Sequence, residues 1–421
     1  MRKAHLTSYV KIIILSICIA ITTFTFKSNN DQGVQSSFPY FSGAANYSSL
    51  FDWRISPDDY VKVAKMSQQE RQAYRYVRTE KTIKNSINNY GYVLVAFAAR
   101  NLFPWLGDTQ AIVLLQALVH TILSLLVLGV LLNTRFQRSL FFLFYAINPF
   151  VIYWVTFPFY YFWSVLPSFV LAVVWFKPDK IRNWFPLLTI TMLFSLLIRP
   201  STLYLVIFVF LVAFFRNNQK ISRRIVLLCF TLFITSFLWL SQQNVWYRSP
   251  FHTAYIGVGI YTNPYGLHGG DQEGYDYYKY KTGETINTDP IVGNANNAKY
   301  MSVLKQRYYE IVKESPLLLV RNAVLNTTQA FGVGINVSRS WTRPFTVGLG
   351  LLIIGLFIFT KQWVWGLGIF AYAIAFTLYY PPIAPYLFGA NILVVLGLCL
   401  AIEKLFYKLL PKSSEEKVSL K

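Results

Sequence analysis

The sequence predicts an all-α polytopic membrane protein with about ten transmembrane helices and two large extracytoplasmic loops that carry surface-lying helices. Three observations point to this class. Of the 421 residues, 54% are hydrophobic and 18% aromatic, and 39 Lys and Arg stand against only 18 Asp and Glu. Long apolar runs recur along the chain. The short connections between several of them hold Lys and Arg. Soluble globular domains lack these features, so we expect a single integral-membrane domain over residues 1–421.

Ten apolar segments are the candidate crossings. They lie at about 9–26, 110–132, 139–157, 160–176, 184–198, 201–215, 225–242, 345–360, 363–380 and 386–406. Several are short, because 15 helical residues span roughly 22 Å of a hydrocarbon core that is roughly 30 Å thick. These segments need support from the charge pattern. The first segment has no small-residue cleavage site, so we expect an uncleaved anchor.

Basic residues gather on one side of this arrangement, as the positive-inside rule requires. With the amino terminus in the cytoplasm, the inner pieces contain Arg2, Lys3, Arg135, Arg138, Lys177, Lys180, Arg182, Arg216, Lys220, Arg223, Arg224 and Lys361. The outer turns at 158–159 and 381–385 contain none, and the turn at 199–200 contains only Arg199. We therefore predict a multi-pass protein of the plasma (inner) membrane with a cytoplasmic amino terminus. We also predict a helix break at IRPS, residues 198–201.

Charge and cysteine content exclude other classes. The net charge of +21 lies largely in short loops, where it sets topology, so we expect no nucleic-acid partner. The three cysteines each fall inside an apolar run, which implies no disulfide framework. Most acidic residues fall in the two long outer loops, about 27–109 and 243–344. Chemistry is therefore expected there.

The first outer loop contains SPDDYVKVAK, which predicts a helix that begins at Ser56 with Pro57 in its first position. Asp58 and Asp59 lie in the first turn. They either complement the helix dipole or serve chemistry in this loop. The later stretch 89–110 is apolar but contains Arg100 and Pro104, which predicts a helix on the membrane surface.

The second outer loop is rich in Tyr and Gly and contains HGGDQE, residues 268–273. This motif is either a polar Gly-rich turn or a divalent-metal site, and we expect no cofactor, with a metal as the alternative. The run at 299–331 predicts an amphipathic helix that ends before Pro316, followed by a surface-lying apolar stretch.

Arg199 and His120 are the ionisable residues of the membrane region that bear most on function. Arg199, beside Pro200 at an outer break, needs a partner or water. It either extends to the interface or holds the phosphate of a lipid carrier, because a guanidinium offers a planar fork of donors. His120, in the second crossing, is expected to be a hydrogen-bonded packing residue.

The order of segments resembles the GT-C class of integral-membrane glycosyltransferases, which includes the dolichyl-phosphate-mannose protein mannosyltransferases and the bacterial transferases that add aminoarabinose to lipid A. The matching pieces are SPDDYVKVA, NYGYVLVAFAARNLFPWLGDTQAIVLLQALVHTILSLLVLGVLL, LFYAINPFVIYWVTFPFYYFW and LLIRPSTLYLV. They fall within roughly residues 9–285. One departure is that INNYGYVLV lacks the proline of the extended G-x-P stretch common in this family.

This resemblance implies a glycosyltransferase that moves a sugar from a polyprenyl-phosphate donor to an acceptor hydroxyl on the outer side, with inversion at the anomeric carbon. Its partners would be membrane lipid, the lipid-linked donor and a glycan or lipid acceptor. A carboxylate must take the acceptor proton, and a cation must stabilise the departing phosphate. By motif position, the base is Asp58 or Asp59. The substrate and lipid-phosphate contacts are Arg199, then Arg248, with His268 and Asp271 as further candidates.

Two other functions stay open. An O-antigen-type polysaccharide polymerase or ligase is also polytopic and basic, and the Arg248 to Gly259 spacing fits the Arg and Gly associated with such polymerases. A flippase or transporter for lipid-linked sugars would need charges deep within the crossings. The crossings here carry almost none, which favours an enzyme.

Overall fold

The computed structural model of the protein describes residues 7–14, 17, 31–84, 89–216, 220–242, 250–286, 297–332, 334, 342–378 and 382–409. Helices dominate, as predicted. The strands described form one small sheet in the first loop, with antiparallel pairs in the order β1-β2-β3: β1 (Tyr47–Ser49), β2 (Asp52–Ile55) and β3 (Ile83–Lys84). The sequence analysis did not predict this sheet, because strands of two to four residues show too little alternation to stand out.

The remaining elements fall into three groups. The first-loop helices are α2 (Asp31–Ala45), α3 (Pro57–Ala64), α4 (Gln68–Ala73) and α5 (Tyr90–Leu102). The bundle contains α6 (Asp108–Leu126), η2 (Val127–Leu131), α7 (Arg135–Phe141), η3 (Phe142–Ala146), α8 (Pro149–Thr156), η4 (Phe162–Val165), α9 (Leu166–Phe176), η5 (Pro178–Lys180), α10 (Ile181–Ile198), η6 (Pro200–Thr202), α11 (Leu203–Arg216), α12 (Lys220–Gln242), α17 (Thr342–Thr360), α18 (Trp363–Leu378), α19 (Ala384–Leu387), η7 (Phe388–Ala390) and α20 (Asn391–Leu409). The second-loop helices are α13 (Pro250–Val258), α14 (Asp271–Thr282), α15 (Asn297–Glu314) and α16 (Pro316–Phe331).

The chain is a helical membrane protein with five helical segments long and apolar enough to cross a bilayer, among the described residues. These are Asp108–Leu131, Pro178–Ile198, Lys220–Leu240, Thr342–Thr360 and Ala384–Lys408. A sixth follows if Arg135–Ala146 and Pro149–Thr156, which meet at 49°, form one broken span. Three apolar helices are shorter: Phe162–Phe176, Pro200–Arg216 and Trp363–Thr377. The prediction of ten crossings stays a prediction, and most of its first segment lies outside the described residues.

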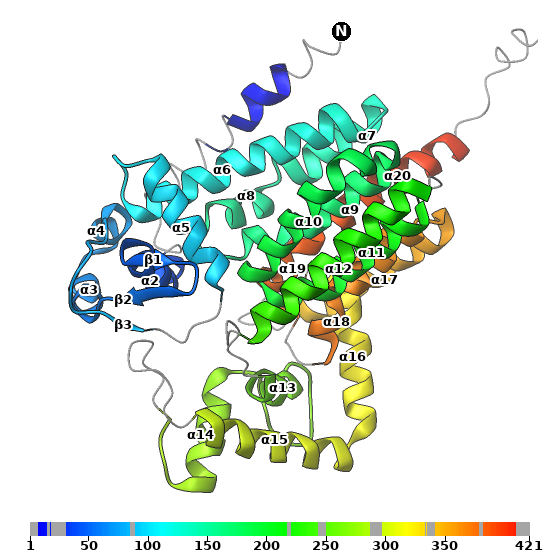
Figure 1. Ribbon diagram of the computed structural model, residues 1–421. Coiled ribbons are helices and arrows are strands. Elements are labelled where there is room, and N and C mark those ends of the chain that lie inside the picture. Colours follow the sequence, from blue (N-terminus) through cyan, green and yellow to red (C-terminus); the bar gives the residue numbers. More distant parts are fainter. Residues whose placement is uncertain are drawn as a thin grey trace, which may run out of the picture.

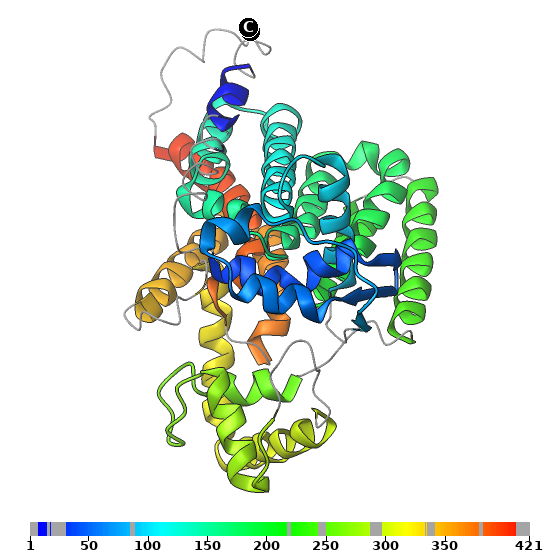
Figure 2. The ribbon, with the colours of Figure 1, turned by 90° about the vertical axis from the view of Figure 1, so that its left-hand side faces the viewer.

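The first-loop and second-loop groups lie against different parts of the bundle (Figures 1 and 2). Helices α2 to α5 and the sheet cover one flank, and they share one continuous hydrophobic core with the bundle. Helices α13 to α15 lie beyond one end of the bundle, joined to it by α16, and have a small core of their own around Tyr278, Tyr300 and Leu304. Helix α7 and the end of α20 lie at the opposite end.

Local sequence explains where several helices begin and end. Ser56 caps α3 by accepting the Asp59 backbone N–H at 3.3 Å, with Pro57 as the first helical residue, as predicted. Helix α15 ends at Glu314, before Pro316, also as predicted. The start of helix α5 packs closely against the end of α10 at Gly91. A Cβ on Gly91 would lie 2.6 Å from Ile198 Cγ1 and 2.7 Å from the Ile198 backbone nitrogen. Only glycine allows this approach.

Candidate functional site

Arg199 lies at the helix break that the IRPS sequence predicted. Helix α10 ends at Ile198, Arg199 is extended with φ −148° and ψ 94°, and Pro200 begins η6. The arginine is buried, with 7% of its surface exposed. Its Nε donates to Ser201 Oγ at 3.1 Å, whereas its Nη1 is buried without a hydrogen-bond partner. Within the described ranges, no carboxylate pairs with it.

Four aromatic rings surround the Arg199 guanidinium, and we call them the aromatic cage. Their centroids lie 4.9 to 5.7 Å from Arg199 Cζ: Tyr386 at 4.9 Å, Tyr161 at 5.5 Å, Tyr160 at 5.6 Å and Phe376 at 5.7 Å. Ring faces attract cations, by about 0.5–1 kcal/mol at exposed sites and about 2 kcal/mol when the pair is shielded from water. The cage therefore offsets part of the cost of burying a charge that has no counterion.

The cage rings come from three segments that are distant in sequence. Tyr160 and Tyr161 lie in the turn between α8 and η4, Phe376 lies in α18, and Tyr386 lies in α19. Hydrogen bonds hold these segments. Tyr372 Oη donates to the Tyr386 carbonyl at 2.9 Å. Gln116 Nε2, from α6, donates to the carbonyls of Val155 at 2.7 Å and Phe157 at 2.9 Å.

The turn at 157–161 also contacts helix α2 of the first loop. Ser37 of α2 donates its hydroxyl to the Pro158 carbonyl. A Cβ on Gly33, in the first turns of α2, would lie 3.0 Å from the Phe157 ring. Phe157 in turn stacks on Tyr161 of the cage, with centroids 6.1 Å apart and an interplanar angle of 17°. The start of α2 therefore lies beside the turn that carries half of the cage.

Asp31, the first residue of α2, is a site candidate that the sequence analysis missed. Its Oδ2 accepts from Gln35 Nε2 at 3.0 Å and pairs with Arg71 Nη2 at 3.3 Å. Its Oδ1 is buried and has no hydrogen-bond partner. The signal was present in the sequence, because DQGVQ combines a first-turn acid with a helix start in the same way as SPDDY does.

Asp59 is buried, with 5% of its surface exposed, and Tyr74 Oη donates to its Oδ1 at 2.9 Å. Its Oδ2 is buried without a partner. Burial raises the pKa of this carboxyl, and the hydrogen bond from Tyr74 lowers it in part. The same burial, with the bond to Asp59, raises the pKa of Tyr74 to about 12. Asp59 is therefore a packed, hydrogen-bonded group.

Asp58 points the other way, as expected of its neighbour on a helix. It is exposed and lines an open groove of about 570 Å³ with Val61, Lys62, Lys65, Met66 and Glu70. None of the described contacts of α3 joins either aspartate to Arg199 or to its cage. The two residues predicted as bases and the predicted phosphate contact are thus not brought together by any contact in the described part of the chain.

A buried ion pair lies close to Asp59 at the start of α6. Asp108 Oδ2 accepts the Tyr76 backbone N–H at 2.8 Å and lies 3.6 Å from Arg100 Nη1, while Arg100 Nη2 donates to the Tyr76 carbonyl at 3.1 Å. These contacts join the strand-like segment after α4 to α5 and α6. We interpret them as a structural connection between the first loop and the bundle.

The HGGDQE motif of the second loop is a helix start. Glu273 accepts the backbone N–H groups of His268 and Gly269, the latter at 3.1 Å, and Gly269 has a φ of +83°. The His268 side chain is exposed. Asp271 accepts from His252 Nε2 at 3.1 Å, and this hydrogen bond lowers the pKa of the Asp271 carboxyl. Asp271 and the backbone of His268 thus contribute to the local fold of α13 and α14, whereas no contact of the His268 side chain is described. Arg248 lies outside the described residues.

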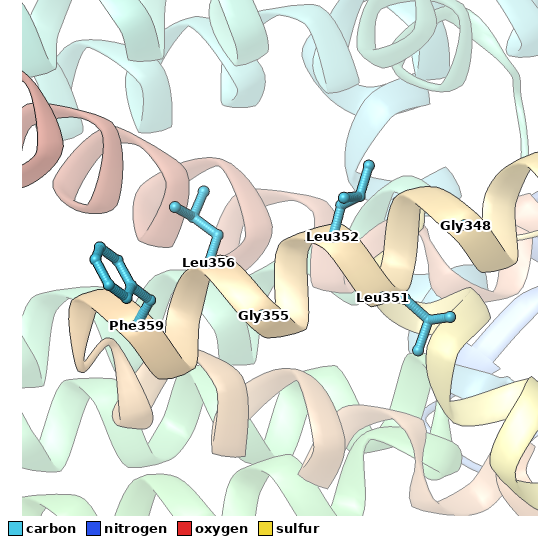
Figure 3. A pocket seen from close by; sticks show the side chains of 6 residues that line it. All are labelled: Gly348, Leu351, Leu352, Gly355, Leu356 and Phe359. Carbon is cyan, nitrogen blue, oxygen red and sulfur yellow. The ribbon is translucent and has the colours of Figure 1, made fainter.

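No group of three or more His, Cys, Asp or Glu side chains with metal-binding geometry occurs among the described residues. His120 is fully buried, and its Nε2 lies 3.0 Å from the Ala146 carbonyl, as the packing interpretation predicted. A hollow of about 700 Å³ lies along α17 and is lined by Gly348, Leu351, Leu352, Gly355, Leu356 and Phe359, which are labelled in Figure 3. All six are apolar, which suits a lipid chain and leaves no group for chemistry.

No protein-family model, curated protein or solved structure matches the chain. The chemistry of the site must therefore carry any functional conclusion. Arg199 offers a buried cation with a donor to spare. Asp31 offers a carboxylate on α2, the helix that contacts the turn carrying Tyr160 and Tyr161, but none of the described contacts joins Asp31 to Arg199. A cation can bind an anion, and a carboxylate can accept a proton.

Proposed function

We propose that the protein is a membrane glycosyltransferase that moves a sugar from a polyprenyl-phosphate donor to an acceptor hydroxyl on the extracytoplasmic side. The product would be a modified cell-surface glycan or lipopolysaccharide. The observation that carries this proposal is the buried Arg199, which has no described carboxylate partner and keeps one terminal nitrogen free of hydrogen bonds. A buried cation of this kind favours an anionic ligand.

A lipid phosphate fits this site better than a soluble anion does. The guanidinium presents donors that match phosphate oxygens. Arg199 follows directly on α10, an apolar helix long enough to cross the membrane, and α18 supplies one ring of the cage. A headgroup held there would leave its polyprenyl chain beside apolar helices. In transfer, the sugar's bond to the phosphate breaks, and Arg199 stabilises the charge that develops on the departing lipid phosphate.

The acceptor hydroxyl must lose a proton to a carboxylate within hydrogen-bond reach. Asp31 is our first choice for this base. It begins the helix that packs on the turn carrying Tyr160 and Tyr161, and its Oδ1 lacks a hydrogen-bond partner. Asp59, already bonded to Tyr74, and the exposed Asp58 are the alternatives that the sequence suggested. The mechanism needs no metal, and a divalent ion remains an alternative source of charge stabilisation.

The test is to delete the gene and extract lipid-linked sugars and surface glycans. Under this proposal, a polyprenyl-phosphate sugar accumulates and one surface glycan lacks that sugar. A polymerase would instead leave single repeat units attached to the lipid and shorten the polymer. A flippase would leave the lipid-linked sugar in the inner leaflet only, where an impermeant glycosidase added outside the cell would not reach it. Unchanged lipids and glycans would contradict all three.

A further inference from the structure

The aromatic cage raises the question of how Arg199 stays in place before any phosphate arrives. An isolated buried guanidinium tends to turn toward water or toward a carboxylate. Arg199 has one side-chain hydrogen bond described, from Nε to Ser201. Four rings lie around the guanidinium, with centroids that are all within 5.7 Å of Cζ.

We infer that Tyr386 is a positioning residue for the phosphate clamp, holding the Arg199 guanidinium by its ring face so that Nη1 stays available to the ligand. This inference rests on the proposed function and adds to it a residue that touches no reacting atom. Tyr386 is the nearest ring, at 4.9 Å. It lies in α19, at the boundary where the sequence analysis placed the end of an outer turn, 381–385, and the start of the last crossing, 386–406.

The backbone around Tyr386 is fixed independently of Arg199. The Tyr372 hydroxyl, on the fully buried Tyr372 of α18, donates to the Tyr386 carbonyl at 2.9 Å. The next turn is equally constrained, because Ser168 Oγ donates to the Gly389 carbonyl at 2.6 Å. Since neither bond involves the arginine, the backbone that carries the Tyr386 ring does not depend on Arg199 for its position. Preorganisation of this kind lowers the cost of ligand binding.

A ring rather than a hydroxyl is what this role requires. A carboxylate in place of Tyr386 would pair with Arg199 and compete with the phosphate. An aromatic face stabilises the cation without using up any of its N–H donors. Tyr386→Phe should therefore preserve the positioning of Arg199, whereas Tyr386→Leu should abolish it, although Phe and Leu are both apolar and similar in size.

The experiment uses the purified full-length protein in lipid nanodiscs and measures binding of a polyprenyl monophosphate, with the corresponding polyprenol as the uncharged probe. We expect wild type to bind the phosphate more tightly than the alcohol. Tyr386→Phe should bind like wild type, and Tyr386→Leu should bind the phosphate about tenfold more weakly, with polyprenol binding unchanged. Tyr204→Leu, an exposed tyrosine next to the same helix break, is the matched control and should have no effect.

Each outcome separates the inference from the proposed function. If wild type binds the alcohol and the phosphate equally, the proposed phosphate clamp is wrong. If Arg199→Ala loses phosphate binding while a folded Tyr386→Leu does not, the clamp stands and the positioning role is wrong. Equal losses of phosphate binding in Tyr386→Phe and Tyr386→Leu would also overturn the positioning role, because the hydroxyl rather than the ring would then hold Arg199. Should Tyr386→Leu unfold, Tyr160→Leu removes a second ring of the cage and carries the same prediction.

Discussion

At the scale of single residues, the three candidate bases make different predictions. If Asp31 takes the acceptor proton, Asp31→Asn should lower transfer by about 100-fold or more while the protein still binds lipid phosphate. Asp58→Asn should retain activity, because Asp58 lines an exposed groove away from the cage contacts. The measurement is restoration of the surface glycan in cells that lack the gene. Full activity of Asp31→Asn together with loss of activity in Asp59→Asn would contradict Asp31 as the base and identify Asp59, which the sequence predicted.

Asp59 also predicts a pH dependence of stability. Burial raises the folded-state pKa of its carboxyl above the ordinary 3.8, so the folded state holds this proton more tightly than the unfolded state. Its contribution to stability therefore falls as pH rises from 3.8 through the raised pKa. Asp59→Asn keeps an acceptor for Tyr74 and removes this pH dependence. Above that pH window the variant should therefore be more stable relative to wild type than it is below the window. Thermal unfolding across pH measures this, with the exposed Asp52→Asn as the control, which should follow wild type.

For Arg199, the sequence predicted the helix break but not the side chains that surround it. An arginine followed by proline between two apolar runs predicts both the helix break and a need for a partner, and the break is confirmed. Its partners, however, come from positions 160, 161, 376 and 386. No periodicity links such distant aromatic residues, because their proximity is created only when α18 and α19 pack against the turn after α8.

At the scale of elements, α16 and α17 cross in close contact. A Cβ on Gly350 would overlap the Thr328 carbonyl, and a Cβ on Gly332 would overlap the Thr346 carbonyl. Gly350→Ala should therefore destabilise the protein by about 1–3 kcal/mol. Gly348 lies on the same helix but faces open space (Figure 3), so Gly348→Ala is a matched control and should be neutral or slightly stabilising. Equal thermal unfolding of the two variants would contradict this packing.

Element boundaries were predicted best where capping residues mark them. Ser56 with Pro57 fixes the start of α3, and Pro316 follows the end of α15. The α2 helix was missed because it contains a proline and eight consecutive buried positions in its C-terminal half, from Ser37 to Ala44, which leave no polar face there to reveal a period. A helix buried on all sides shows no amphipathic pattern.

At the scale of the whole molecule, both outer-loop groups should lie on the same side of the membrane. A cysteine-free background with single cysteines at Asp58, Tyr280 or Lys361 tests this, since all three positions are exposed in the structure. An impermeant maleimide should label Asp58→Cys and Tyr280→Cys in intact cells, and Lys361→Cys only after permeabilisation. Labelling of Lys361→Cys from outside would contradict the predicted number of crossings between these positions.

Composition and the positive-inside rule were enough to predict a helical membrane protein, because both depend on the membrane rather than on tertiary contacts. The number of crossings is harder to predict. Segments such as Phe162–Phe176 and Trp363–Thr377 are apolar but short, so length alone decides neither for nor against them. Contacts between the bundle and the first loop, such as Ser37 on Pro158, are invisible in a sequence read segment by segment.

The central claim is that Arg199 binds the phosphate of a lipid-linked sugar donor. The most direct measurement is the amount of polyprenyl-phosphate sugar in cells lacking the gene and complemented with wild type, Arg199→Lys or Arg199→Ala at equal protein levels. Wild type should remove the accumulated donor, Arg199→Lys should do so partially because it keeps the charge without the fork of donors, and Arg199→Ala should leave the donor accumulated. Clearance of the donor by Arg199→Ala at the wild-type rate would contradict the claim.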